Sequence, residues 1–369
     1  MNETQLVSSS AIAWLGAGLG AIFGWVGNRT NFCTMGAISD VVNMGAWRRA
    51  RMWMFAAGVA ILATGALQLA GQIDIGKSIY AGTRLLWMSH LVGGLMFGIG
   101  MTLAGGCGAK TLIRLGGGNL RALVVYAFMA IAAYMTLKGL FAVWRVAVLE
   151  PVSIVLPAAQ DLPSLLARGA GLERRAALLA LMAIAGGGLV GLALAGREFR
   201  QREPLLGGLA IGLLVAAGWY VTGHIGYVAD HPDTLQEAFI GTNSGRAESL
   251  SFVAPYAYTM ELLTFWSDSS RIVTFGIALG LGAVAGSAAC ALASRQFRIE
   301  SFHDVGDLRR HLIGAVLMGA GGITALGCTI GQGISDISTL SIGSILTTIA
   351  IVAGSAATMK VQEWRETAE

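Results

Sequence analysis

Long apolar runs separated by short charged or Gly-rich segments dominate this chain. An α-helix that crosses the hydrocarbon core of a bilayer, roughly 30 Å thick, needs about 20 mostly apolar residues. Nine runs approach this length. The pattern predicts membrane-spanning helices at residues 11–27, 52–71, 85–104, 120–140, 176–196, 205–222, 272–293, 312–326 and 340–359.

The composition places the chain in the same class. Of its 369 residues, 55% are hydrophobic and only 12% are charged, whereas soluble domains carry about 25% charged residues. We therefore expect an all-α integral membrane protein of about nine transmembrane helices, with short re-entrant or broken helices, in a lipid bilayer. The first ten residues lack the basic segment of a secretory signal, so the first run is expected to be a permanent helix.

The distribution of lysine and arginine predicts the orientation, because cytoplasmic loops are enriched in these residues. With the N-terminus outside, sixteen of the 25 basic residues fall in inner segments or the C-terminal tail. We expect a multi-pass protein of the inner (cytoplasmic) membrane, with the N-terminus outside and the C-terminus in the cytoplasm. The net charge of +4 is then a topology signal, and no nucleic-acid partner is predicted.

An internal repeat organises the chain. Residues 90–107 align without a gap with residues 311–328 and are identical at 8 of 18 positions. Under the predicted topology the two copies run in opposite directions, as in transporters whose substrate site lies between inverted repeats. We expect one transmembrane domain over 1–369, with pseudo-symmetric halves at approximately 1–148 and 176–369.

Three polar, Gly-rich segments interrupt the apolar pattern, and each carries one cysteine. Unpaired backbone groups cannot face lipid, so these segments must be buried in protein or line a cavity. Short helices that begin there would direct free N–H groups at an anion. The predicted substrate-binding residues are Cys33, Cys107 and Cys328, and the predicted supporting residues are Gly36, Gly106, Gly108, Lys110, Gly327, Thr329 and Gln332.

Several residues have two interpretations. Asp40 and Asp336 end similar Ile-Ser-Asp motifs and are expected to be helix caps, with proton carriage as the alternative. His90 and His311 begin the repeated segments and are expected to be structural, although histidine can also handle protons. Lys110 is either a snorkelling side chain or a cation for an anionic substrate.

Other uses of the cysteines are weighed against transport. No two cysteines lie closer than 38 residues, which disfavours a zinc site. A membrane thiol-redox protein is the alternative from a different class, although the spacing shows no redox pair. Cys290 lies in an apolar run and is expected to be a small filler. The common phosphate-loop, zinc-protease and nucleophile-elbow motifs are missing, so no enzymatic activity, catalytic residue, metal or cofactor is predicted.

The motifs NRTNFCTMGAISD, LAGGCGAKTLIRLGGGN and LGCTIGQGISDIS, in this order, resemble the YeeE/YedE family of sulfur-compound transporters. The resemblance implies an hourglass-shaped protein that takes up thiosulfate, with Cys33, Cys107 and Cys328 at successive points of the path. It implies transfer from thiol to thiol by hydrogen bonding without a lasting covalent bond. It also implies a cytosolic TusA-like sulfur-carrier protein as a candidate partner. Some relatives are linked to selenium metabolism, so selenium-containing or other sulfur compounds are alternative substrates.

Thiol chemistry agrees with a soft anion as the substrate. Cysteine sulfur is polarisable and a weak hydrogen-bonding group, so it can accompany the terminal sulfur of thiosulfate without holding it tightly. Weak successive sites suit conduction, because each site must release what it binds. Sulfate, which has only hard oxygen atoms, is expected to be a poorer substrate.

Overall fold

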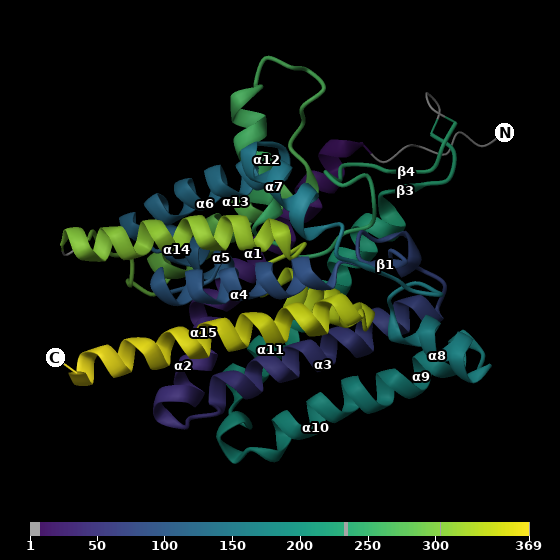
Figure 1. Cartoon of the computed structure of the whole chain (residues 1–369), viewed down its shortest axis with the longest axis horizontal. Helices are drawn as coiled ribbons and strands as arrows, with labels where there is room; N and C mark the ends of the chain where they lie inside the picture. The colour runs from purple at the N-terminus through teal and green to yellow at the C-terminus, as the bar shows by residue number, and fades with distance from the viewer. Residues whose placement is uncertain (1–7, 232–234, 303, 369) are drawn as a thin grey trace.

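The computed structural model describes residues 8–231, 235–302 and 304–368, and helices dominate this part of the chain (Figure 1). The helices before residue 150 are α1 (Ser9–Arg29), α2 (Thr34–Met44), α3 (Arg48–Leu69), η1 (Ile75–Lys77), α4 (Trp87–Leu103), α5 (Gly108–Gly116), α6 (Leu120–Lys138), α7 (Leu140–Trp144) and η2 (Arg145–Leu149).

The later helices are α8 (Leu162–Ala170), α9 (Arg174–Leu181), η3 (Met182–Gly187), α10 (Gly188–Ala195), η4 (Arg197–Phe199), α11 (Arg202–Tyr220), η5 (Val221–Ile225), α12 (Ala254–Thr264), α13 (Phe275–Ala293), α14 (Val305–Thr324), η6 (Gly331–Asp336), η7 (Ile337–Thr339) and α15 (Ile342–Ala368). Two short antiparallel pairs complete the list, β1 (Arg84–Leu85) with β2 (Ile154–Val155) and β3 (Tyr227–Val228) with β4 (Ala238–Phe239).

Eight helical stretches of the described chain are long and apolar enough to cross a bilayer. They contain α1, α3, α4, α6, α9 to α10, α11, α13 and α15. The all-α membrane class expected from the sequence is therefore confirmed. The ninth expected span, residues 312–326, lies in α14, whose first turns carry Asp307, Arg309 and Arg310 and shorten its apolar part.

Polar side chains mark where several of these helices begin. Ser8 accepts a hydrogen bond from the N–H of Ala11 at the start of α1, and Asn119 accepts one from Ala122 at the start of α6. Such caps satisfy N–H groups that have no partner within the helix. Capping residues therefore fix the starts of α1 and α6, whereas α3, α4, α11 and α13 begin without a side-chain cap.

Glycine allows the two repeated helices, α4 and α14, to cross at close range. A Cβ atom at Gly100 would lie 2.6 Å from the carbonyl oxygen of Gly314, and one at Gly314 would lie 2.6 Å from that of Gly100. Gly93 and Gly321 approach each other in the same reciprocal way. Small residues allow this backbone contact between membrane helices. A two-fold axis between the halves would produce such a reciprocal pattern.

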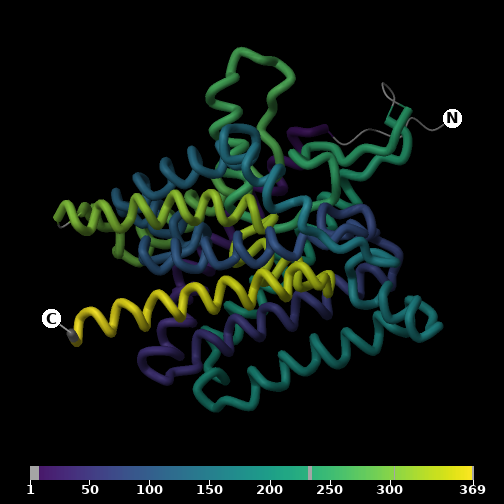
Figure 2. Tube along the Cα trace, viewed as in Figure 1, coloured from purple at the N-terminus to yellow at the C-terminus, as the bar shows by residue number. Residues whose placement is uncertain are grey.

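The two ends of the molecule differ in their elements (Figures 1 and 2). Helix α2, the end of α10 and the C-terminal end of α15 gather at one end, and β1, β3, β4 and α8 lie at the opposite end. The first end holds the turns that the basic residues assign to the cytoplasm. We call it the inner end and the opposite one the outer end.

A cation holds the β3–β4 hairpin against the loop that contains η1 at the outer end. The ammonium group of Lys77 donates hydrogen bonds to Glu237 and, at 2.7 Å, to the phenol oxygen of Tyr227. These two acceptors raise the pKa of Lys77 to about 12. The loops of the outer end are therefore fixed to one another by polar contacts as well as by the strand pairs.

Candidate functional site

The three predicted cysteines lie at junctions with the same backbone course. Each junction follows a long helix and contains a residue with positive φ two positions before the cysteine. The following N–H donates to a carbonyl group five residues back, as in a Schellman helix end. The residues with positive φ are Asn31 (53°), Gly105 (66°) and Leu326 (62°).

Two of the three sulfur atoms act as caps for the chain that follows. Cys33 Sγ accepts a hydrogen bond from the N–H of Gly36 at 3.4 Å, and Cys328 Sγ accepts one from the N–H of Gly331 at 3.4 Å. Cys107 precedes α5 without a side-chain capping bond. The N–H of Lys110, three residues after Cys107, approaches the middle thiol at the equivalent position.

The structure brings the three cysteine segments together in the interior. The thiols of Cys33 and Cys107 are close neighbours, and the Thr329 hydroxyl approaches Cys107; neither pair makes a hydrogen bond of standard geometry. The phenol of Tyr256 interacts electrostatically with both Cys107 and Cys328. All three cysteines are buried, with 7%, 2% and 0% of Cys33, Cys107 and Cys328 exposed. Cys107 therefore lies between Cys33 and the Cys328 segment.

Tyr256 is a site residue that the sequence analysis missed. Its hydroxyl donates a hydrogen bond of 2.7 Å to the carbonyl oxygen of Gly108, at the first residue of α5. The aromatic ring also packs against Tyr126, with ring centroids 4.5 Å apart. Nothing in the sequence around Tyr256 resembles the cysteine motifs, so no local pattern could have identified it.

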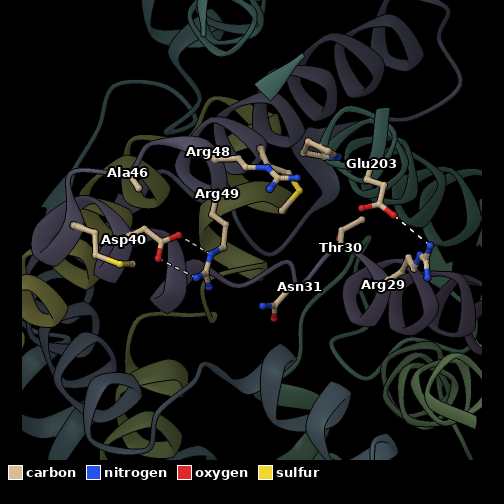
Figure 3. A pocket seen from close by; sticks show the side chains of 11 residues that line it. Arg29, Thr30, Asn31, Asp40, Ala46, Arg48, Arg49 and Glu203 are labelled. Carbon is tan, nitrogen blue, oxygen red and sulfur yellow. Dashed lines mark hydrogen bonds and ion pairs between the residues drawn. The ribbon is translucent and has the colours of Figure 1, made fainter. Parts of the chain in front are cut away.

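Cations and two cavities lie on the inner side of Cys33. A cavity of about 450 Å³ is lined by Arg29, Asn31 and Arg49, among others (Figure 3). A second cavity, of about 430 Å³, shares Arg29 and Asn31 and includes Lys110 and Arg114. The approach to the cysteines from the inner end is therefore basic and would attract an anion.

Ion pairs and hydrogen bonds position these cations. Arg49 binds Asp40 with both ends of its guanidinium group, at 2.6 and 2.9 Å, and Arg29 lies 3.3 Å from Glu203 (Figure 3). Lys110 donates a hydrogen bond of 2.5 Å to the side-chain oxygen of Asn31 and interacts electrostatically with the Cys33 thiol. Lys110 thus points to the cysteine segments. From the sequence, the positive charge of Arg49 predicted only the orientation in the membrane.

The segment after Cys328 has a different character. Gln332 is fully buried, and neither atom of its side-chain amide has a hydrogen-bond partner. Asp336 is 1% exposed and accepts a hydrogen bond from the Thr339 hydroxyl at 3.0 Å. Within the described residues, Asp336 makes no ion pair. This part of the interior is polar but carries no cation.

The predicted supporting glycines lie where side chains need space. A Cβ atom at Gly36 would lie 2.3 Å from Arg49 Nη1, and one at Gly327 would lie 3.0 Å from Gln332 Cγ. At Gly106 it would lie 3.3 Å from Lys110 Cγ, and at Gly108 the nearest atom, on Val253, would be 3.5 Å away.

The remaining ionisable candidates have defined partners. His90 is buried with Nδ1 2.7 Å from the Thr347 hydroxyl, and His311 Nδ1 lies 2.8 Å from the carbonyl oxygen of Asp307. Neither Asp40 nor Asp336 makes the capping hydrogen bond expected from the sequence, because Asp40 binds Arg49 and Asp336 binds Thr339.

The four cysteines, including Cys290 in α13, are free thiols. No cluster of His, Cys, Asp or Glu suited to a metal occurs in the part of the chain that the structure describes.

Comparisons with known proteins agree with this picture. The sequence model of the sulphur transport family matches residues 29–357 of this chain. The thiosulfate transporter TsuA of Escherichia coli (strain K12) is 26% identical over 339 residues, which cover 85% of this chain and 84% of the relative. The thiosulfate transporter TsuA of Spirochaeta thermophila is 24% identical over 350 residues, covering 92% and 96%. Because the family match spans most of the sequence, including all three cysteine junctions, this chain belongs to the sulphur transport family.

Proposed function

We propose that this protein takes up thiosulfate across the inner membrane by passing it along Cys328, Cys107 and Cys33. The observation that carries the proposal is the placement of Cys107 directly beside Cys33 and next to the Cys328 segment. The two relatives are both described as thiosulfate transporters, which supports the choice of anion. Selenium-containing and other sulfur anions are the alternative substrates.

The path runs from a neutral interior to a basic exit. At Cys328 the anion meets uncharged polar groups. The side chains of Gln332 and Thr329 have atoms without hydrogen-bond partners, and these atoms can bind the anion. Two helices of at least nine residues, α2 and α5, begin directly after Cys33 and Cys107, so their N–H groups face the later steps. Lys110 and Arg49 then attract the anion to the inner cavities.

Hydrogen bonding is the proposed interaction of each thiol with the anion. A weak donor with a polarisable sulfur can bind the terminal sulfur of thiosulfate and release it again. Gly36, Gly106 and Gly327 support the path by leaving space for the side chains beside the cysteines, and Gly108 supports it by accepting the hydrogen bond of Tyr256 through its carbonyl oxygen. No catalytic group or cofactor takes part in this mechanism.

We also propose the orientation and organisation expected from the sequence. The basic inner end faces the cytoplasm, so the N-terminus lies outside and the C-terminus inside. The chain is one domain of two halves, 1–148 and 176–369, which the reciprocal glycine contacts of α4 and α14 support. A cytosolic TusA-like sulfur-carrier protein would receive the anion at the inner cavities.

Uptake by purified protein in proteoliposomes tests the proposal. Labelled thiosulfate should accumulate, unlabelled thiosulfate should compete with it, and sulfate should compete poorly. Selenite and sulfite, added separately, address the alternative anions. Uptake that sulfate inhibits as well as thiosulfate does would contradict the selectivity assigned to the thiols.

The contact between Cys33 and Cys107 favours a second candidate, a membrane thiol-redox protein. Two neighbouring thiols can lose two protons and two electrons to an oxidant and form a disulfide. Free-thiol titration before and after exposure to a mild oxidant, in parallel with uptake, separates the candidates. A loss of two thiols with no thiosulfate uptake would favour the redox function.

A further inference from the structure

One buried acid has no place in the anion path. Asp336 closes η6, eight residues after Cys328, and is 1% exposed. Among the described residues, the side chains that donate hydrogen bonds toward its carboxyl group are the hydroxyl groups of Thr339 and Ser341. The Ser341 hydroxyl is itself buried and makes no hydrogen bond of standard geometry. An ionised carboxylate in such a site lacks the compensation that buried charges require.

Among the described residues, no counter-ion pairs with Asp336: Asp161, which bridges Ser341, is itself paired with Arg174, and His90 contacts the Thr347 hydroxyl. Helices α3, α11 and α15 and the segment η7 pack against η6. The charged residues of α3 and α11 lie in their first turns at the inner end, and those of α15 begin at Lys360, far along that helix. Tyr80, from the loop after η1, is the ionisable side chain that interacts electrostatically with Asp336.

Tyr80 connects Asp336 with the anion path and with the outer end. Its phenol is buried and interacts electrostatically with Asp336, Cys328 and Glu248. The Tyr80 ring packs edge-on against Trp219, whose Nε1 donates a hydrogen bond of 3.1 Å to Ser338, two residues after Asp336. An anion at Cys328 and a charge at Asp336 are therefore close enough to influence each other.

We propose that Asp336 binds a proton that accompanies the anion through the protein. This inference rests on the proposed function. A dianion next to an ionised Asp336 is repelled, whereas a dianion next to a protonated Asp336 is not. By linkage, binding of the anion then favours binding of the proton to the same degree.

A bound proton also reduces the free energy needed to move the anion against the membrane potential. Moving a dianion into a cell with a negative interior is opposed by the membrane potential. A carboxyl group that is loaded with a proton from the outer side reduces the charge that moves inward. Sodium is a poorer occupant, because the two hydroxyl groups beside the carboxyl provide too few oxygen ligands for a metal ion.

Proton movement in proteoliposomes tests this proposal. A pH-sensitive dye is trapped inside, and thiosulfate is added outside without any pH gradient. The wild-type protein should acidify the interior as thiosulfate enters. An acidic outside solution should lower the thiosulfate concentration that gives half-maximal uptake by at least about fivefold, the lower end of usual coupling between two ligands. Replacing sodium by choline should change neither result.

Asp336→Asn keeps the shape and hydrogen-bonding atoms of the side chain but cannot carry the proton. This variant should take up thiosulfate along its concentration gradient without acidifying the interior and without acceleration by external acid. Asp40→Asn is the matched control, since Asp40 ends the same motif but is paired with Arg49. It should keep the number of protons moved per thiosulfate, whatever its uptake rate. Asp336→Glu, which retains an acid, should keep it too.

The outcomes separate this inference from the proposed function. Wild-type uptake without proton movement, or uptake that requires sodium, overturns the role of Asp336 whether or not any variant folds. Proton movement that persists in Asp336→Asn also overturns it. The absence of thiosulfate uptake by the wild-type protein would instead overturn the proposed function, and this inference with it.

Discussion

The segments that begin at Cys33 and Cys328 share a sequence pattern but have different surroundings. Both read Cys-Thr, an apolar residue and Gly, and both later reach Ile-Ser-Asp. In both, the cysteine sulfur accepts a hydrogen bond of 3.4 Å from the glycine N–H. After Cys33 the chain forms an 11-residue α-helix, whereas after Cys328 it forms a six-residue π-helix.

The charges around the two segments differ more than their backbones. Asp40 is held by Arg49 beside an open inner cavity, whereas Asp336 is buried with hydroxyl partners alone. Similar local motifs therefore lie in basic surroundings at Cys33 and in a neutral interior at Cys328. The difference teaches that the motif builds the thiol site, while the neighbouring helices decide its charge.

The largest effect is expected from removing the thiols that both segments present. Cys33→Ala, Cys107→Ala and Cys328→Ala should each nearly abolish thiosulfate uptake at normal protein levels, because each removes one point of the path. Labelled thiosulfate uptake in proteoliposomes measures this. The matched control is Cys290→Ala, which should be close to silent because this buried thiol lies within α13. Wild-type uptake in all three variants would refute the relay.

Serine variants distinguish hydrogen bonding from covalent sulfur transfer at the two ends. Serine keeps a hydroxyl donor and acceptor but is no sulfur nucleophile. Cys328→Ser and Cys33→Ser should therefore retain uptake above the level of the corresponding alanine variants. Intact-protein mass spectrometry after exposure to thiosulfate should show no added sulfur on the wild type. A stoichiometric persulfide together with inactive serine variants would establish a covalent mechanism.

Charge removal should affect the Cys33 end alone. Lys110→Gln and Arg49→Gln should each lower the maximal rate of thiosulfate uptake about three- to tenfold, since each removes an attractive charge from the inner cavities through which the anion leaves. The effect should shrink at high salt, which screens exposed charges. Arg200→Gln, at the same end but outside both cavities, is the control. An equal loss of rate in this control would mean that general surface charge attracts the anion.

The smallest effects should come from added methyl groups at the matched glycines. In Gly331→Ala the new Cβ, at a buried position, would lie 2.8 Å from the hydroxyl oxygen of half-buried Ser251, so stability should fall by about 1–3 kcal/mol. In Gly36→Ala it would meet the flexible end of Arg49, which can move aside. Thermal unfolding in detergent should therefore show a larger loss for Gly331→Ala. The reverse order would show that the Cys33 segment is the more tightly packed one.

The sequence by itself determined the membrane class, the approximate helix positions and the three cysteine junctions. Apolar runs longer than a bilayer crossing have few alternatives to a helix in lipid, because backbone groups must be paired. Polar, Gly-rich breaks in such runs are equally informative, since they must be buried among helices. Motif order along the chain was enough for the family resemblance, which the match over residues 29–357 bears out.

Tertiary structure alone decided which distant groups meet the cysteines. The packing of α12 places Tyr256 against Gly108. The ion pair with Asp40 holds Arg49, whose charge predicted only the membrane topology, beside the Cys33 segment. The same packing leaves Asp336 without a cation, although its motif matches that of Asp40. Local sequence sets backbone course, but burial and charge depend on neighbours far along the chain, and these exist only once the helices have packed.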